Sequence, residues 1–183
     1  MRKIFYLIAM AAFLLAACHD GKTGKAQDSD STQTFVDDSD STVYGVCGEG
    51  TGMHSLELVT NNGDTLNYLI NMDDESTVQG GLMAGDRLAV YAVKNADGEN
   101  EARSVINLTT LLGKWTSIDK NFEIQEGGQV ESFVKAESHP YTSWRIYNGK
   151  LLLNADTFRI DMLGADSLYL ENKTGIFAYK RQK

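Results

Sequence analysis

The chain has 183 residues, of which 17 are basic and 25 acidic, and its formal net charge at pH 7 is −8. A chain this acidic repels phosphate backbones and anionic head groups, so we expect no nucleic-acid partner. Two cysteines and three histidines at scattered positions do not match a disulfide framework or a zinc-ligand spacing. No G-x-S-x-G elbow or other nucleophile–base pattern occurs. We therefore expect no enzyme, no metal and no cofactor.

Residues 1–17 have the features of a secretory signal peptide. Arg2 and Lys3 precede an apolar run that extends from Ile4 to Ala17. This run is too short for a spanning helix, which needs about 20 apolar residues. It fits the apolar centre of a signal peptide, which is followed by small residues.

The end of the run resembles the lipobox of bacterial lipoproteins. It reads Leu-Ala-Ala-Cys and ends at Cys18. The resemblance implies that the thiol of Cys18 is lipidated and that this residue becomes the new N-terminus. Several acyl chains together hold a protein stably on a bilayer, whereas one chain alone is marginal. A plain signal peptide with an incidental cysteine is the alternative. The mature chain would carry 15 basic and 25 acidic residues, a net charge of −10.

Residues 18–41 contain almost no apolar side chains, so we expect a disordered acidic tether. Two Asp-Ser-Thr triplets lie in this segment, at 30–32 and 40–42. They are similar to the triplets that carry O-glycans in secreted proteins of Bacteroides-type bacteria. The resemblance makes Ser31 and Ser41 candidate O-glycosylation sites. Ordinary turn chemistry of aspartate before serine is the alternative.

From Thr42 onward the pattern changes to short alternating runs, as in Leu66, Tyr68 and Ile70. Period two is typical of strands with one buried face. Turn pairs such as Asn148-Gly149 separate the runs. The sequence thus predicts an all-β fold with two small antiparallel barrel-like modules, at residues 42–110 and 111–183.

Five strands are expected in the first module. They lie near Thr42–Cys47, Ser55–Thr60, Asp64–Met72, Asp86–Val93 and Ala102–Leu108. Asp73 and Asp74 are expected to cap one or two helical turns that end at Gly80-Gly81 or Gly85. Five strands with a small helix after the third resemble the OB-fold. Cys47 is expected to be a small buried residue without a disulfide partner.

Eight strands are expected in the second module. They begin near Gly113, Asn121, Gln129, Tyr141, Lys150, Asp156, Ser167 and Ile176. Gly113-Lys114-Trp115 matches the G-x-W signature of lipocalins, and residues 111–183 resemble the small lipocalin-like domains of Bacteroides-type envelope lipoproteins. The resemblance implies that Trp115 lies across the closed end of a barrel. It also implies that a cation from Arg181 or Lys180 stacks on this indole.

Strands of about five residues leave little room inside such a barrel. We expect the interior to be filled by apolar side chains and to hold no large cavity. The expected set is Phe122, Ile124, Phe133, Trp144, Ile146, Leu151, Leu153, Phe158, Ile160, Leu168, Leu170, Phe177 and Tyr179.

These observations predict a lipoprotein of the cell envelope. The lipid on Cys18 would hold it on the outer membrane, with the periplasmic side favoured and surface exposure left open. The expected function is that of a non-enzymatic binding module that contacts another envelope protein or a glycan. The alternative is a lipocalin-like carrier of a small apolar ligand in the second barrel.

Overall fold

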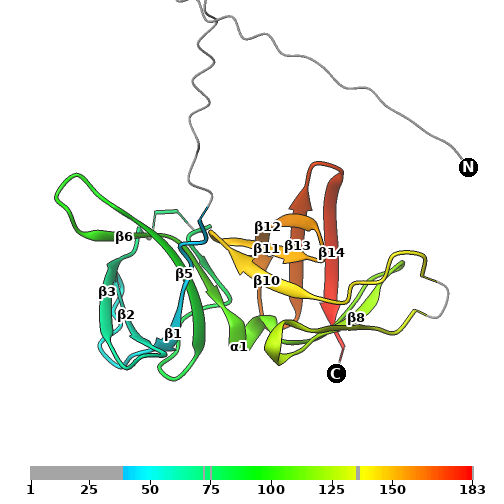
Figure 1. Ribbon diagram of the computed structural model, residues 1–183, viewed down its shortest axis with the longest axis horizontal. Helices are drawn as coiled ribbons and strands as arrows, with labels where there is room; N and C mark the ends of the chain where they lie inside the picture. Colours follow the sequence, from blue (N-terminus) through cyan, green and yellow to red (C-terminus); the bar gives the residue numbers. More distant parts are fainter. Residues whose placement is uncertain (1–38, 72, 75, 135–136, 183) are drawn as a thin grey trace, which may run out of the picture. The chain divides into compact units, whose positions relative to one another are not determined.

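β-strands dominate the computed structural model and form two sheets (Figure 1). The structure describes residues 39–71, 73–74, 76–134 and 137–182. The predicted all-β class is confirmed. In these ranges no helix is long and apolar enough to cross a membrane.

The first sheet has the order β3-β2-β1-β5-β6-β4. A parallel pairing of Leu69 with Glu101 joins β3 to β6, so the strands return on themselves as in an OB-like barrel. The strands are β1 Val43–Cys47, β2 Ser55–Thr60, β3 Thr65–Leu69, β4 Val78–Gln79, β5 Arg87–Lys94 and β6 Asn100–Asn107. Alternate side chains of these strands form one core: Cys47, Leu56, Leu58, Tyr68, Ile70, Leu88, Val90, Ala102 and Val105.

The helical turns expected after the third strand are absent from the described residues there, so this prediction is wrong. Asp74 instead accepts a hydrogen bond from the backbone N–H of Ser76, which closes a local turn. Val78–Gln79 then pairs with β6 as the parallel strand β4. The short helix of this module is α1, Leu108–Leu111, where we expected the last strand to end. Asn107 caps α1 by accepting a hydrogen bond from the N–H of Thr110.

The second sheet has eight strands in the order β10-β11-β12-β13-β14-β7-β8-β9. The number of strands agrees with the prediction. An isolated bridge between Gln129 and Ser143 connects its two ends, so the sheet is a nearly closed barrel. The strands are β7 Gly113–Thr116, β8 Asn121–Ile124, β9 Val130–Ser132, β10 Trp144–Tyr147, β11 Lys150–Leu153, β12 Asp156–Leu163, β13 Ser167–Asn172 and β14 Gly175–Arg181. A 3-10 turn, η1 Glu126–Gly128, precedes β9.

Aromatic side chains fill the interior of the second barrel. Phe122 contacts Tyr179 and Tyr141 edge to face, with ring centroids 5.1 and 5.4 Å apart. Phe158 makes the same type of contact with Tyr141 and Phe177. Such pairs stabilise a core beyond the area they bury.

The predicted interior set is confirmed in all but one member. Ten of its residues are buried, and Trp144 and Phe177 pack against them while partly exposed. Phe133 is the exception because its side chain is 39% exposed. It lies beyond the end of β9, where the strand alternation no longer applies, and Lys114 lies over its ring.

The two sheets share buried contacts. Ala89 and Ile106 of the first sheet belong to the same apolar cluster as Trp115 and Phe122. The buried side chain of Gln79 accepts a hydrogen bond from the backbone N–H of Leu163 at 2.9 Å. The division at residue 110 stays a prediction, and α1 spans it.

The described structure begins within the segment expected to be a tether. The backbone N–H of Ser41 donates to the side chain of Asn148, whose amide donates to the carbonyl of Ser39. The carboxylate of Asp40 accepts hydrogen bonds from the backbone N–H groups of Thr42 and Asn148. Residues 39–42 are therefore fixed on the turn between β10 and β11.

Candidate functional site

The three signature residues Gly113, Trp115 and Arg181 meet at one end of the second barrel. The indole of Trp115 is fully buried, and its N–H donates to the carbonyl of Leu111 at 2.8 Å. The guanidinium carbon of Arg181 lies 4.1 Å from the ring centroid. Arg181, and not the exposed Lys180, thus occupies the position over the indole.

The guanidinium also binds three backbone carbonyls. Arg181 donates to Leu112 at 2.9 Å, to Ala165 at 2.6 Å and to Thr110. Burial lowers the pKa of Arg181, although the nearby carboxylate of Asp166 opposes that shift. All these contacts are internal, so the signature residues close this end of the barrel.

A polar cluster lies beside the aromatic core. The ammonium of Lys120 lies 4.3 Å from the ring centroid of Tyr141, pairs with Glu137 and donates to the carbonyl of His139 at 3.1 Å. The hydroxyls of Tyr141 and Tyr179 are hydrogen-bonded to each other, and burial raises the pKa of both phenols. These polar groups therefore pair with one another beside the aromatic core.

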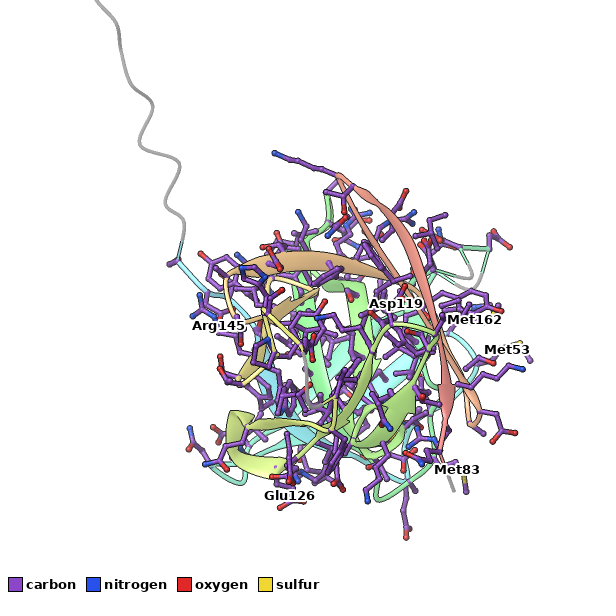
Figure 2. All side chains as sticks on the ribbon, turned by 90° about the vertical axis from the view of Figure 1, so that its right-hand side faces the viewer. Met53, Met83, Asp119, Glu126, Arg145 and Met162 are labelled. Atoms are coloured by element: carbon purple, nitrogen blue, oxygen red, sulfur yellow. The ribbon has the colours of Figure 1, made fainter. Side chains whose placement is uncertain are left out.

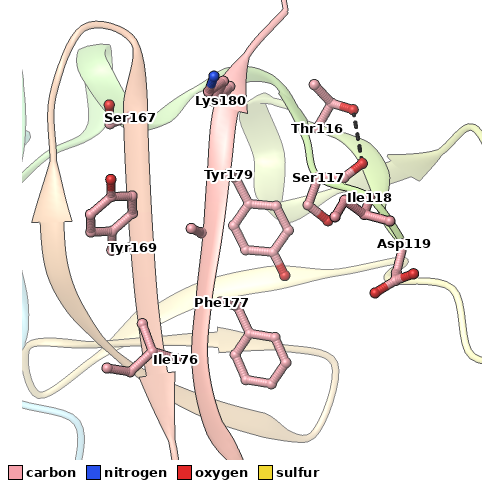
Figure 3. Close-up of a pocket in the computed structure, with 11 residues that line it drawn as sticks. Thr116, Ser117, Ile118, Asp119, Ser167, Tyr169, Ile176, Phe177, Tyr179 and Lys180 are labelled. Carbon is pink, nitrogen blue, oxygen red and sulfur yellow. Dashed lines mark hydrogen bonds between the residues drawn. The ribbon is translucent and has the colours of Figure 1, made fainter.

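A cleft of about 560 Å³ lies between β14 and the turn that connects β7 to β8 (Figure 3). This volume lies within the range of ligand-binding clefts. We call it the β14 cleft. Its lining consists of Thr116, Ser117, Ile118, Asp119, Ser167, Tyr169, Ile176, Phe177, Ala178, Tyr179 and Lys180.

The β14 cleft arises because β14 and β7 separate. Their register contains Lys180 opposite Thr116 and Arg181 opposite Trp115, and it does not continue toward Gly175. In Figure 3 the rings of Phe177 and Tyr179 extend from β14 toward the opposite wall. Ile118 and Asp119 lie on that wall, in the turn between β7 and β8.

Exposed apolar side chains surround the cleft. Ile118 is completely exposed and Ile176 is 65% exposed. On the outer face of the sheet, the register places Met162 beside Tyr169 and Tyr169 beside Ala178. Met162, which Figure 2 labels, is 49% exposed. An isoleucine that buries nothing contributes nothing to the core, and clustered exposed apolar residues mark interaction sites.

The candidate residues from the sequence are not brought together at this cleft. Cys18 and Ser31 lie outside the described residues, and Ser41 is exposed on the β10–β11 turn. Cys47 is a free, buried thiol, as predicted. His54 and His139 are exposed. No three His, Cys, Asp or Glu side chains in the described part of the chain lie close enough to hold a metal ion.

Sequence reasoning missed Ile118 and with it the cleft. The signal was present as a lone isoleucine in the polar turn Thr-Ser-Ile-Asp-Lys. Ile118 borders a cleft only because β14 separates from β7, and β14 lies about sixty positions away in the chain.

The comparisons with known proteins agree with the barrel. Residues 107–182 match the model of the lipocalin-like family. No curated protein and no solved structure matches the chain. The match includes α1 and every strand from β7 to β14, so the second sheet is similar to a lipocalin-like domain.

Proposed function

We propose that the protein is a lipid-anchored lipoprotein of the cell envelope and acts as a non-enzymatic binding module through the β14 cleft. The lipocalin-like domain supports a binding role. The observation that carries the proposal is the fully exposed Ile118 beside an apolar cleft of about 560 Å³. Its occupant would be another envelope component.

The alternative was a carrier of a small apolar ligand in the barrel interior. The edge-to-face aromatic cluster of Phe122, Tyr141, Phe158 and Tyr179 occupies that interior. This packing favours the side cleft over the interior as the binding site.

A photo-crosslinking amino acid at position 118 tests the binding role in the native envelope. We expect a discrete crosslinked product, because Ile118 lines the cleft and is completely exposed. Position 83 is the matched control, since Met83 is 72% exposed and does not line the cleft. Equal products from both positions, or none from 118, would contradict the proposal.

The anchor is tested by metabolic labelling with an alkyne analogue of palmitate. We expect label on the wild-type protein and none on Cys18→Ala, which keeps the signal segment but lacks the thiol. The leaflet is tested by protease treatment of intact cells, where we expect protection of the periplasm-facing protein. Release of a processed, unlabelled wild-type protein would refute lipidation.

Glycosylation of Ser31 or Ser41 is a separate part of the proposal. Ser41 is exposed, and the neighbouring Asp40 is held by Thr42 and Asn148. Intact mass of protein from its own cells is expected to exceed that of the lipidated polypeptide. Ser31→Ala and Ser41→Ala would each remove the mass of one glycan. A mass equal to that of the bare lipidated polypeptide would disprove glycosylation.

A further inference from the structure

The edge of β14 that faces the cleft is unpaired over most of its length. On its other side β14 pairs with β13 from Gly175 to Lys180 without a break. On the cleft side, described residues pair with it at Lys180 and Arg181, and the N–H of Gln182 donates to Lys114. Five residues, Gly175–Tyr179, thus present an open strand edge.

The direction of the hydrogen-bonding groups follows from the ends of the strand. The N–H of Arg181 donates to Asp166 beside β13, whereas the N–H of Gln182 donates to Lys114 of β7. Successive residues of an antiparallel strand direct these groups to opposite sides. The N–H and C=O groups of Ile176 and Ala178 therefore point into the cleft.

The opposite wall limits what can occupy this edge. The turn that carries Ile118 and Asp119 faces β14 across the cleft (Figure 3). A second copy of the barrel would bring its own β14 with its own facing turn, and the two turns would obstruct each other. A single extended segment brings no such turn, and five strand residues span about 17 Å.

The charges at the cleft indicate which charged residues the bound segment would carry at its two ends. Lys180 and Asp119 line it, and neither forms an ion pair with another described residue. An acidic residue of the segment would form an ion pair with Lys180, and a basic residue would form one with Asp119. Apolar residues between them would contact Phe177, Ile176 and Ile118.

We propose that the β14 cleft binds a linear peptide segment of a partner protein, which adds to the sheet as an extra strand along Gly175–Tyr179. Main-chain hydrogen bonds to Ile176 and Ala178 supply affinity, and alternate side chains supply specificity, as in other strand additions. An open strand edge invites such pairing, and on this side no described residue is paired in register with Gly175–Tyr179. This inference rests on the proposed function and specifies the partner.

The test uses the mature chain from residue 18 with Cys18→Ala and the synthetic probe acetyl-Glu-Val-Thr-Val-Thr-Lys-amide. We expect saturating probe to slow amide hydrogen exchange of Ile176 and Ala178 by about tenfold or more, because both N–H groups become hydrogen-bonded. The amides of Leu168 and Leu170, already within the ladder, serve as internal controls. Unchanged exchange at Ile176 and Ala178 would overturn the proposal.

Two N-methylated probes separate main-chain pairing from side-chain contact. One carries N-methyl groups on the second and fourth residues, the other on the third and fifth. A strand on this edge turns alternate N–H groups toward β14, so one probe is expected to lose binding and the other to keep it. Equal binding of both probes would show contact without strand addition and would overturn the inference.

The charge prediction has its own control. Lys180→Glu is expected to lower the affinity for this probe by about tenfold. It is expected to raise, also by about tenfold, the affinity for a probe whose terminal glutamate and lysine are exchanged. If Lys180→Glu changed the affinity for neither probe, the predicted pairing of charges would be contradicted. Amide exchange at the cleft that is slowed by an oligosaccharide but not by the probe would overturn the proposal of a peptide occupant. Dimerisation through β14 would overturn it as well. Crosslinking from position 118 would then still support the proposed binding function, so the two proposals fail separately.

Discussion

The guanidinium of Arg181 stacks on the buried indole of Trp115 at 4.1 Å, and Gly113 makes room for it. A Cβ at Gly113 would lie 2.6 Å from Nη1 of Arg181, and the φ of Gly113 is 124°. The guanidinium of Arg181 can therefore stack on Trp115 only because Gly113 has no Cβ. The spacing of Gly113 and Trp115 follows from it, because the residue between them points to the other side of β7.

Trp115→Ala should destabilise the fold by about 3–5 kcal/mol, because a fully buried indole leaves a cavity and its hydrogen bond to Leu111 is lost. Denaturant unfolding followed by circular dichroism measures the change. Ile118→Ala is the control, since Ile118 is completely exposed and its truncation should cost almost nothing. An unchanged midpoint for Trp115→Ala would contradict its closing role.

Gly113→Ala should destabilise by about 1–3 kcal/mol, from backbone strain at positive φ and from the contact with Arg181. In an Arg181→Ala background the steric part disappears and the strain remains. We therefore expect the double mutant to be more stable than the sum of the single effects indicates. Strict additivity in the unfolding free energies would show that the guanidinium does not occupy this space.

Gln79→Leu should lower the unfolding free energy by about 1–3 kcal/mol, because it leaves the buried N–H of Leu163 without its acceptor. The loss should appear in one cooperative transition, since the sheets share a core. Gln182→Leu is the exposed control. Two separate transitions in the wild-type protein would show that the sheets unfold independently.

Stability should fall above about pH 10, where tyrosine ionises in the unfolded chain. Burial raises the pKa of Tyr179 well above that value, and its hydrogen bond to Tyr141 acts in the same direction. The folded state then retains a proton that the unfolded state releases, so the unfolding free energy decreases as pH rises. Tyr179→Phe should flatten this slope between pH 9 and 11, as measured by denaturant unfolding at each pH.

The anchoring of residues 39–42 should depend on the ionisation of Asp40. Burial opposes its charge, but hydrogen bonds from Thr42 and Asn148 outweigh burial and lower the pKa of Asp40. A lowered pKa stabilises the ionised form, so the contacts persist at neutral pH and weaken below about pH 4. Amide exchange at Asn148 should then accelerate relative to Leu151. In Asp40→Asn this acceleration should be absent.

Local patterns predicted every strand of both modules except β4. Period-two alternation and turn pairs such as Asn148-Gly149 act over a few residues, which is why every strand of the second barrel begins within three positions of its expected start. The sequence left Arg181 and Lys180 both open as the stacking cation, and the structure places Arg181 over the indole of Trp115.

The misplaced helix shows where local patterns failed. Asp73 and Asp74 resemble a cap, but the pairing of Val78–Gln79 with β6 and the buried contact of Gln79 with Leu163 involve distant residues. Those tertiary interactions outweigh a weak helical preference.

The sequence by itself determined the all-β class, the strand positions other than β4, most of the barrel interior and the likeness to lipocalins, because each depends on local spacing. The tertiary structure alone decided where β14 and β7 separate, and therefore that Ile118 faces an open strand edge. Strand separation depends on register between segments far apart in the chain, and alternation within one strand carries no information about it.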